Sequence, residues 1–232
     1  MLNVLAYAAA AMAGEYELGW VFWVVMTIGA GATLTLIFMS ARGALVGKRL
    51  VDAAAASQRN LLQEMLVPII EVLGAITVTT AIQERKELKK QMTHVVITAA
   101  RLVGPAASRV CFLELEGAAG SRVLKCRPGM WIGRQETPQT KFEEGTQRGD
   151  RLLGHMDSRR PLFVADLTSE APALQPDSNT YKTFIAAAVA PSINHEAYGI
   201  LAIDAMAPGD LQEGDKKIIE VLGQLLGSAL AM

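Results

Sequence analysis

The chain has 232 residues, 51% of them hydrophobic and 19% charged, with 22 basic against 23 acidic side chains. This balance, without a basic stripe interleaved with aromatic residues, gives no support for nucleic-acid binding. The hydrophobic content is only slightly above that of an ordinary globular chain, which excludes a multi-pass transporter and fits one membrane segment plus one domain.

The longest uncharged stretch, LGWVFWVVMTIGAGATLTLIFMSA, covers residues 18–41. About 24 helical residues, at about 1.5 Å each, can cross a hydrocarbon core of about 30 Å. Two tryptophans near its start suit the headgroup layer, and the basic residues after its end, Arg42, Lys48 and Arg49, favour the cytoplasm. We therefore expect a single-pass protein of the cell membrane with a short external N-terminus, residues 1–17. A buried core helix is the alternative for residues 18–41.

Residues 42–83 have few turn signals and an apolar spacing typical of helices, which predicts a helical linker. The apolar positions at steps of three and four are Leu62, Met65, Ile69, Val72, Ile76 and Thr79. This seam fits a parallel dimeric coiled coil, and it fits a helix packed onto its own domain about equally well. Pro68 lacks the amide hydrogen of an inner helical turn and predicts a kink or break just before it. A second membrane span over residues 65–82 is disfavoured by positive-inside counting, because the basic segment QERKELKK follows it.

From residue 84 the pattern changes to one helix, several short strands and a closing helix, which predicts an α+β domain over residues 84–232. The first helix is expected to end at Gly104 and Pro105. The predicted strands are residues 110–116, 122–127, 162–166, 183–193 and 198–206, and the closing helix is residues 211–231.

The loop GAAG, residues 117–120, predicts a hairpin between the first two strands. If this loop is symmetric, Cys111 lies directly across from Cys126. A cross-strand thiol pair could cycle to a disulfide and serve as a redox sensor. The alternative is that both thiols pack in the core and stay reduced in the cytosol.

Two polar connections that contain proline, residues 129–161 and 168–181, suit the walls of a binding pocket. Arg151, Arg159 or Arg160 could pair with an anionic ligand through a guanidinium fork, and Asp166 could orient a polar group at the rim. The mixed charges of this region fit a solvated loop as well.

From about residue 84 to the C-terminus, the chain resembles the GAF family of small-molecule sensor domains. The segments that carry the resemblance are RVCFLELEG, GHMDSRRPLFVADL, TFIAAAVAPSINHEAYGILAIDAM and LQEGDKKIIEVLGQLLGSAL. The resemblance implies an antiparallel sheet of about six strands, with helices on one face, a ligand cavity on the other, and dimerisation through the terminal helices. The PAS fold is the nearest alternative.

The resemblance does not name a ligand or cofactor. The KFEE sequence of residues 141–144 lacks the spacing of cyclic-nucleotide GAF domains, neither cysteine lies where bilins attach, and three isolated histidines predict no metal site. No catalytic motif is recognisable, so we do not expect an enzyme. We expect a membrane-anchored homodimer whose cytoplasmic domain senses a small molecule or a protein and relays it to a separate effector. The alternatives are a ligand-free membrane-tethered adaptor and a thiol redox sensor that uses Cys111 and Cys126.

Overall fold

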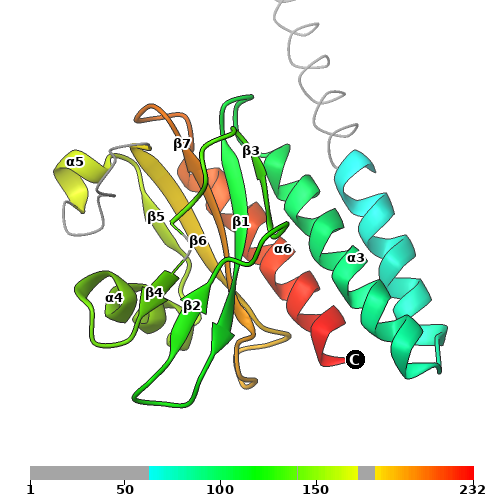
Figure 1. Cartoon of the computed structure of the whole chain (residues 1–232). Coiled ribbons are helices and arrows are strands. Elements are labelled where there is room, and N and C mark those ends of the chain that lie inside the picture. Colours follow the sequence, from blue (N-terminus) through cyan, green and yellow to red (C-terminus); the bar gives the residue numbers. More distant parts are fainter. Residues whose placement is uncertain (1–62, 140, 172–180) are drawn as a thin grey trace, which may run out of the picture. The chain divides into compact units, whose positions relative to one another are not determined.

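A curled antiparallel sheet is the centre of the computed structural model, which describes residues 63–139, 141–171 and 181–232 (Figure 1). Within these ranges seven strands join in the order β4-β2-β1-β7-β6-β5, and β3 pairs with β1 beside this path. The strands are β1 Arg109–Glu116, β2 Val123–Lys125, β3 Trp131–Gly133, β4 Lys141–Glu143, β5 Leu162–Val164, β6 Thr183–Val189 and β7 Gly199–Ala205. All belong to a unit that spans residues 61–232. The α+β class is confirmed.

Helices cover both faces of this sheet (Figure 1). The two long ones, α3 (Ile82–Arg101) and α6 (Glu213–Ala231), pack side by side on one face. On the opposite face, α4 (Gln147–Asp157) packs against β4 and β6, and the single turn α5 (Leu167–Glu170) follows β5. The arrangement leaves one long helical layer and one short, more open layer.

Helix α6 lies very close to β6 and the residues that follow it. A Cβ atom added at Gly223 would lie 2.8 Å from the carbonyl oxygen of Ala188. One added at Gly227 would lie 2.3 Å from the carbonyl carbon of Ala190. The two glycines, one helical turn apart, therefore permit a backbone-to-backbone contact that no other residue type allows without movement of the helix.

Residues 63–78 are helical and pack into the same core as α3 and α6. The buried residues of this helix are Met65, Ile69, Val72 and Ile76. Four positions of the predicted seam are thus covered by the chain's own domain. Of the kink or break predicted just before Pro68, the break is excluded, because the helix runs through the proline and ends at residue 78; the kink stays a prediction. Burial of side chains on both sides of the proline stabilises the helix despite the lost backbone hydrogen bond.

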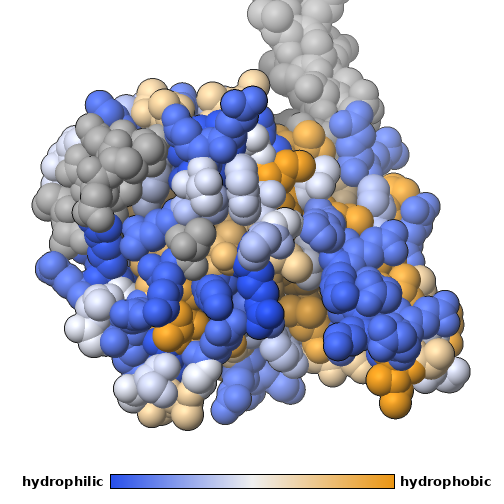
Figure 2. Space-filling model, in the orientation of Figure 1, coloured by the Kyte–Doolittle hydropathy of each residue, from blue (hydrophilic) through white to orange (hydrophobic). Residues whose placement is uncertain are grey.

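Apolar side chains gather on the surface at the turn between this helix and α3, at the lower right of Figure 2. Val78 and Ile82 in this turn are 79% and 85% exposed. Val67 and Ile70, on the outer side of the helix, are also exposed. Large exposed aliphatic side chains that cluster in this way are typical of contact surfaces.

The strands that the sequence predicted are present as β1, β2, β5, β6 and β7, and both long helices lie where they were expected. The connection predicted over residues 129–161 is not a continuous loop, because β3, β4 and α4 lie within it, but its Pro138, Gln139, Phe142 and Leu152 do line a cavity. Three-residue strands are too short for alternation to be visible, and α4 has charged or polar residues at most of its exposed positions.

The predicted register of the β1–β2 hairpin is also wrong. Glu114 pairs with Lys125, so the loop comprises residues 117–122 and is longer than the expected GAAG turn. The amide of Ser121 donates to the carbonyl oxygen of Ala118, so the turn continues beyond Gly120. As a result Cys111 is not directly across from Cys126, and instead it pairs with residues of β3 and β7.

The predicted membrane helix, residues 18–41, and the external N-terminus, residues 1–17, lie outside the described residues. In the part of the chain that the structure describes, no helix combines the length and apolar character needed to span a bilayer.

Candidate functional site

Successive residues of β1 point to opposite faces of the sheet, as the pleat of a strand requires. Val110 and Phe112 are buried in the core that α3 and α6 share. Cys111 and Leu113 are buried in a second cluster on the α4 side. Neighbouring strands β6 and β7 alternate in the same way. β1, β6 and β7 therefore contribute side chains to the cores on both faces of the sheet.

A cavity of about 50 Å³ lies on the α4 side of the sheet. Its apolar walls come from β1, β4, β6, β7 and α4, and its lining side chains include Leu113, Phe142, Leu152, Phe184, Ile200 and Ala202. Arg109 and Asp204, at adjacent strand positions, form its polar end. The volume is enough for roughly three to five water-sized groups.

Two arginines surround the Asp204 carboxylate. The Arg109 guanidinium donates to Oδ2 through Nε at 3.0 Å and through Nη2 at 2.8 Å. Arg134 donates to Oδ1 from the other side. The Arg109 side chain is only 2% exposed, and its third donor, Nη1, bonds to the carbonyl oxygen of Glu136 at 2.8 Å. Burial raises the pKa of Asp204, and the two arginines oppose this effect.

Tyr181 lies beside this charged cluster at the edge of the cavity. Its ring centroid is 6.0 Å from the Arg109 guanidinium carbon and 6.1 Å from the ring of Phe184, which it meets edge to face. Burial raises the pKa of the Tyr181 phenol, with a smaller contribution from Asp204. The tyrosine is therefore a neutral hydroxyl at any physiological pH.

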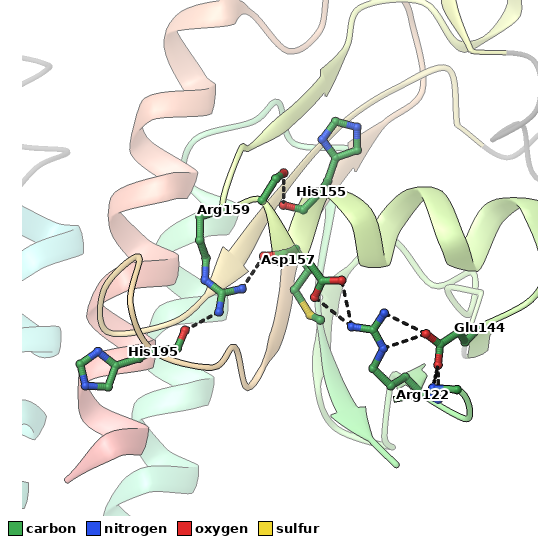
Figure 3. Close-up of polar contacts among 9 residues, drawn as sticks. Arg122, Glu144, His155, Asp157, Arg159 and His195 are labelled. Atoms are coloured by element: carbon green, nitrogen blue, oxygen red, sulfur yellow. Dashed lines mark hydrogen bonds and ion pairs between the residues drawn. The ribbon is translucent and has the colours of Figure 1, made fainter. Parts of the chain in front are cut away.

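The wall formed by α4 is fastened to the sheet by a three-residue ionic cluster (Figure 3). Arg122, next to β2, donates through Nε and Nη2 to Oε1 of Glu144 at 3.0 and 2.9 Å. Its Nη1 lies 2.9 Å from both carboxylate oxygens of Asp157 at the end of α4. Arg122 lowers the pKa of Glu144 through these hydrogen bonds. We call Arg122, Glu144 and Asp157 the α4 clamp.

No family model matches this sequence significantly, and no curated protein does. Solved structures do resemble the described fold. The GAF domain region of a candidate membrane protein from Geobacter sulfurreducens PCA aligns at 16% identity over 65% of this chain and 97% of its own, with a TM-score of 0.50. The chain has a GAF-like fold.

Two further solved structures have a similar degree of structural similarity to this chain. The chromophore-binding domain of the bacteriophytochrome RpBphP3 from R. palustris aligns at 8% identity over 73% of this chain and 60% of its own, with a TM-score of 0.50. A type II free methionine-R-sulfoxide reductase from Thermoplasma acidophilum aligns at 16% identity over 63% of this chain and 94% of its own, with a TM-score of 0.49. At such low identities these likenesses concern the fold alone.

The residues that the sequence singled out as ligand contacts do not line the cavity of the GAF-like domain. Arg151 and Arg160 are exposed. Asp166 caps α5, where it accepts hydrogen bonds from the amide and hydroxyl of Thr168 at 2.9 and 2.6 Å. Their assignment as ligand contacts stays a prediction.

Arg159 connects the end of α4 to the loop between β6 and β7 (Figure 3). Its guanidinium donates to the carbonyl oxygens of Met156 and His195. The backbone of Arg159 has a φ of 55°, in the left-handed region that non-glycine residues rarely adopt. The hydrogen bonds and the left-handed backbone both indicate that Arg159 fixes the conformation of the segment that follows α4.

Cys111 and Cys126 are both buried and free, and their side chains interact despite the shifted register. The hydrogen bond between them raises the pKa of Cys111 and lowers that of Cys126. Cys111 also lines the cavity. The thiol pair is therefore next to the site, with Cys126 the more acidic member.

Sequence reasoning missed Arg109, Asp204 and Tyr181. The available signal was a single aspartate inside the apolar run YGILAIDAM and an arginine directly before the apolar run VCFL. A lone charge in a buried strand requires a partner. Which partner it has depends on the β1–β7 register, which the sequence does not specify.

Proposed function

We propose that this protein is a membrane-anchored signalling protein whose GAF-like domain binds a small molecule in the Arg109–Asp204 cavity and relays its presence to a separate effector. The membrane helix of residues 18–41 would place the domain in the cytoplasm. The observation that carries the proposal is a cavity with apolar walls and a buried charged end; its volume of about 50 Å³, well below the about 300–1,000 Å³ of most ligand pockets, restricts the ligand to a few non-hydrogen atoms unless the walls move.

The relay would pass through the central strands. Ligand contacts with Cys111 and Leu113 act on the same strand whose alternate residues, Val110 and Phe112, pack against the helical layer. A ligand that binds one arrangement of this layer more tightly than another shifts the equilibrium between them. A coupling of about 1–3 kcal/mol would change the affinity for an effector about 5- to 150-fold.

Homodimerisation is part of the proposal. The seam of the helix over residues 63–78 is buried in its own domain, so a partner copy would use the outer side of that helix. Val67, Ile70, Val78 and Ile82 supply exposed apolar surface there. The coiled coil would then continue toward the membrane through the linker.

The decisive test is native mass spectrometry of the full chain purified in mild detergent, followed by denaturing extraction and identification of small molecules. A stoichiometric ligand, lost when Leu113 is replaced by Trp to fill the cavity, supports the sensor. Replacement of exposed Val221 by Trp is the matched control and should retain the ligand. A dimer that carries nothing, and whose melting temperature no metabolite changes, would favour the ligand-free adaptor.

The thiol pair supports a second candidate function, a redox sensor. Reaction of the Cys126 thiolate with a peroxide breaks the O–O bond and gives a sulfenic acid and water or alcohol. Attack by the Cys111 sulfur then forms the disulfide and releases water. The lowered pKa of Cys126 favours it as the first thiol to react.

This candidate is tested by peroxide treatment of the full chain and intact mass measurement. Loss of two hydrogen atoms, reversed by dithiothreitol and absent from Cys126→Ser, is the expected result. A variant of Cys126 that binds ligand and effector as the wild type does, before and after peroxide, would remove a redox role.

A further inference from the structure

The charged side chains at the cavity balance one another. Arg109 and Asp204 line its polar end, and the Nε and Nη2 atoms of Arg109 both donate to Oδ2 of Asp204. Arg134 is not part of the lining; it donates to Oδ1 of Asp204, and its Nε lies 3.3 Å from an oxygen of Glu136. Two arginines therefore face two carboxylates, and the described part of the lining offers a ligand no unpaired charge of either sign.

The remaining titratable side chains of the described lining, Cys111 and Tyr181, are uncharged near neutral pH. The hydrogen bond with Cys126 and burial raise the pKa of Cys111, and burial raises the pKa of Tyr181. A charged ligand would lose its water shell on entry and find no opposite charge to replace it, which is strongly unfavourable. The site therefore disfavours anions and cations alike.

Most of the wall is apolar. The side chains of Leu113, Leu152, Phe184 and Ile200 have no hydrogen-bonding atoms, so water beside them has few partners and an apolar group displaces it favourably. A single hydroxyl or carbonyl group can face the polar end, whereas a body with several polar groups would leave some of them without partners. The volume of about 50 Å³ holds roughly three to five non-hydrogen atoms without movement of the walls.

From this arrangement we infer that the cavity binds a small uncharged molecule that has a short aliphatic body and at most one hydroxyl or carbonyl group. The aliphatic body contacts the apolar walls, and the oxygen faces the Arg109–Asp204 pair. The inference rests on the proposed sensor function and names the class of its ligand.

The inference is tested by saturation-transfer NMR of the full chain in detergent with acetone and isopropanol as probes. Acetate and isopropylammonium are their anionic and cationic matches in size and shape, and urea is an uncharged match without an apolar body. Acetone and isopropanol should bind saturably, and the two ions and urea at least about 10-fold more weakly. Equal binding of either ion or of urea, or no saturable binding of acetone and isopropanol, would overturn the inference.

A cavity-filling variant locates the site and corrects for uptake of the probes by detergent. Ala202 of β7 lines the cavity, and Ala202→Leu places additional carbons inside it. This variant should weaken acetone binding at least about 10-fold, and Ala202→Val is the smaller change if the leucine does not fold. Ala119→Leu, in the exposed loop after β1, is the matched control and should bind acetone as the wild type does. Unchanged binding by folded Ala202→Leu, or an equal loss in Ala119→Leu, would overturn the assignment to this cavity.

The ligand class and the proposed function can fail separately. A stoichiometric anion or cation recovered by denaturing extraction, and lost in Ala202→Leu, would support the sensor and overturn the uncharged class. Recovery of no ligand, together with no binding of any probe and no metabolite that changes the melting temperature, would overturn both.

Discussion

On the α3–α6 side of the sheet, Val110 and Phe112 of β1, Ile185, Ala187 and Val189 of β6, and Leu201, Ile203 and Ala205 of β7 form an apolar, almost fully buried layer. On the α4 side, the same strands present the Cys111 thiol and the Asp204 carboxylate, which is paired with two arginines, and they line a cavity. One face is closed by backbone contact with α6, and the other by short elements and ionic contacts. From this comparison we predict that stability depends mainly on the first layer, and the proposed ligand site lies in the second.

The largest expected effect on stability lies on the cavity side, because the charged cluster there is also buried. It is therefore an exception to the division between the two layers. Asp204→Asn removes the anion between Arg109 and Arg134 and should lower the free energy of unfolding by about 3–5 kcal/mol. Urea unfolding measures the change. Glu87→Gln, at an exposed pair with Lys90, should change stability by less than about 0.5 kcal/mol. Similar values for both variants would mean that the buried cluster contributes no more than a surface pair.

The closed face is tested within one helix. Gly227→Ala forces α6 away from the Ala190 backbone and should lower the free energy of unfolding by about 1–3 kcal/mol. Gly214→Ala, in the first turn of α6, meets no atom within 4 Å and should be neutral or stabilise by up to about 1 kcal/mol. Thermal or urea unfolding of both variants measures the difference. Equal effects would show that α6 is free to shift on the sheet.

The α4 clamp should have a small global effect and a clear local one. Arg122→Gln should cost less than about 1 kcal/mol in unfolding, because the cluster is partly exposed to solvent. Amide hydrogen exchange should nevertheless rise in β4 and α4. Arg127→Gln, which removes two exposed ion pairs at the end of β1, is the control and should leave α4 unchanged. Unaltered exchange in α4 would show that its apolar side chains alone retain it.

The smallest expected effect is the pH dependence of this local exchange. Because Arg122 lowers the pKa of Glu144, the stabilisation is complete above the ordinary glutamate value of about 4.3 and is lost as the pH falls through the folded-state value. Exchange in α4, corrected for its intrinsic rate, should rise at acidic pH in the wild type but not in Arg122→Gln. The same acid response in both proteins would assign it to another group.

The two layers also differ in how well the sequence predicts them. The helical layer follows from local periodicity, which places Ile219, Leu222 and Leu226 of α6 in the core. The antiparallel strands on which it packs are visible as alternating or continuous apolar runs. Pro68 is the exception. Its missing backbone amide favours a helix break, but burial of the side chains around it keeps the helix continuous.

The cavity depends on non-local pairing and is correspondingly harder to predict. Arg109 and Asp204 are 95 residues apart and meet only because the β1–β7 register places them side by side. Arg151, Arg159 and Arg160, which stand out because they lie close together in the sequence, are on exposed or connecting segments. A charge run is visible in a sequence, whereas the partner of a single buried charge is fixed by the strand register.

Because alternate residues of β1 are buried on opposite faces of the sheet, the strand also limits how this sequence can diverge. Insertion or deletion of a single residue within the strand would exchange its odd and even positions, which would place Phe112 on the cavity side and Leu113 among the helices. Substitutions can change one layer at a time, but a change in strand length by one disrupts both at once. Length variation among descendants of this chain should therefore be confined to the loops, such as residues 117–122, while the length of β1 stays constant.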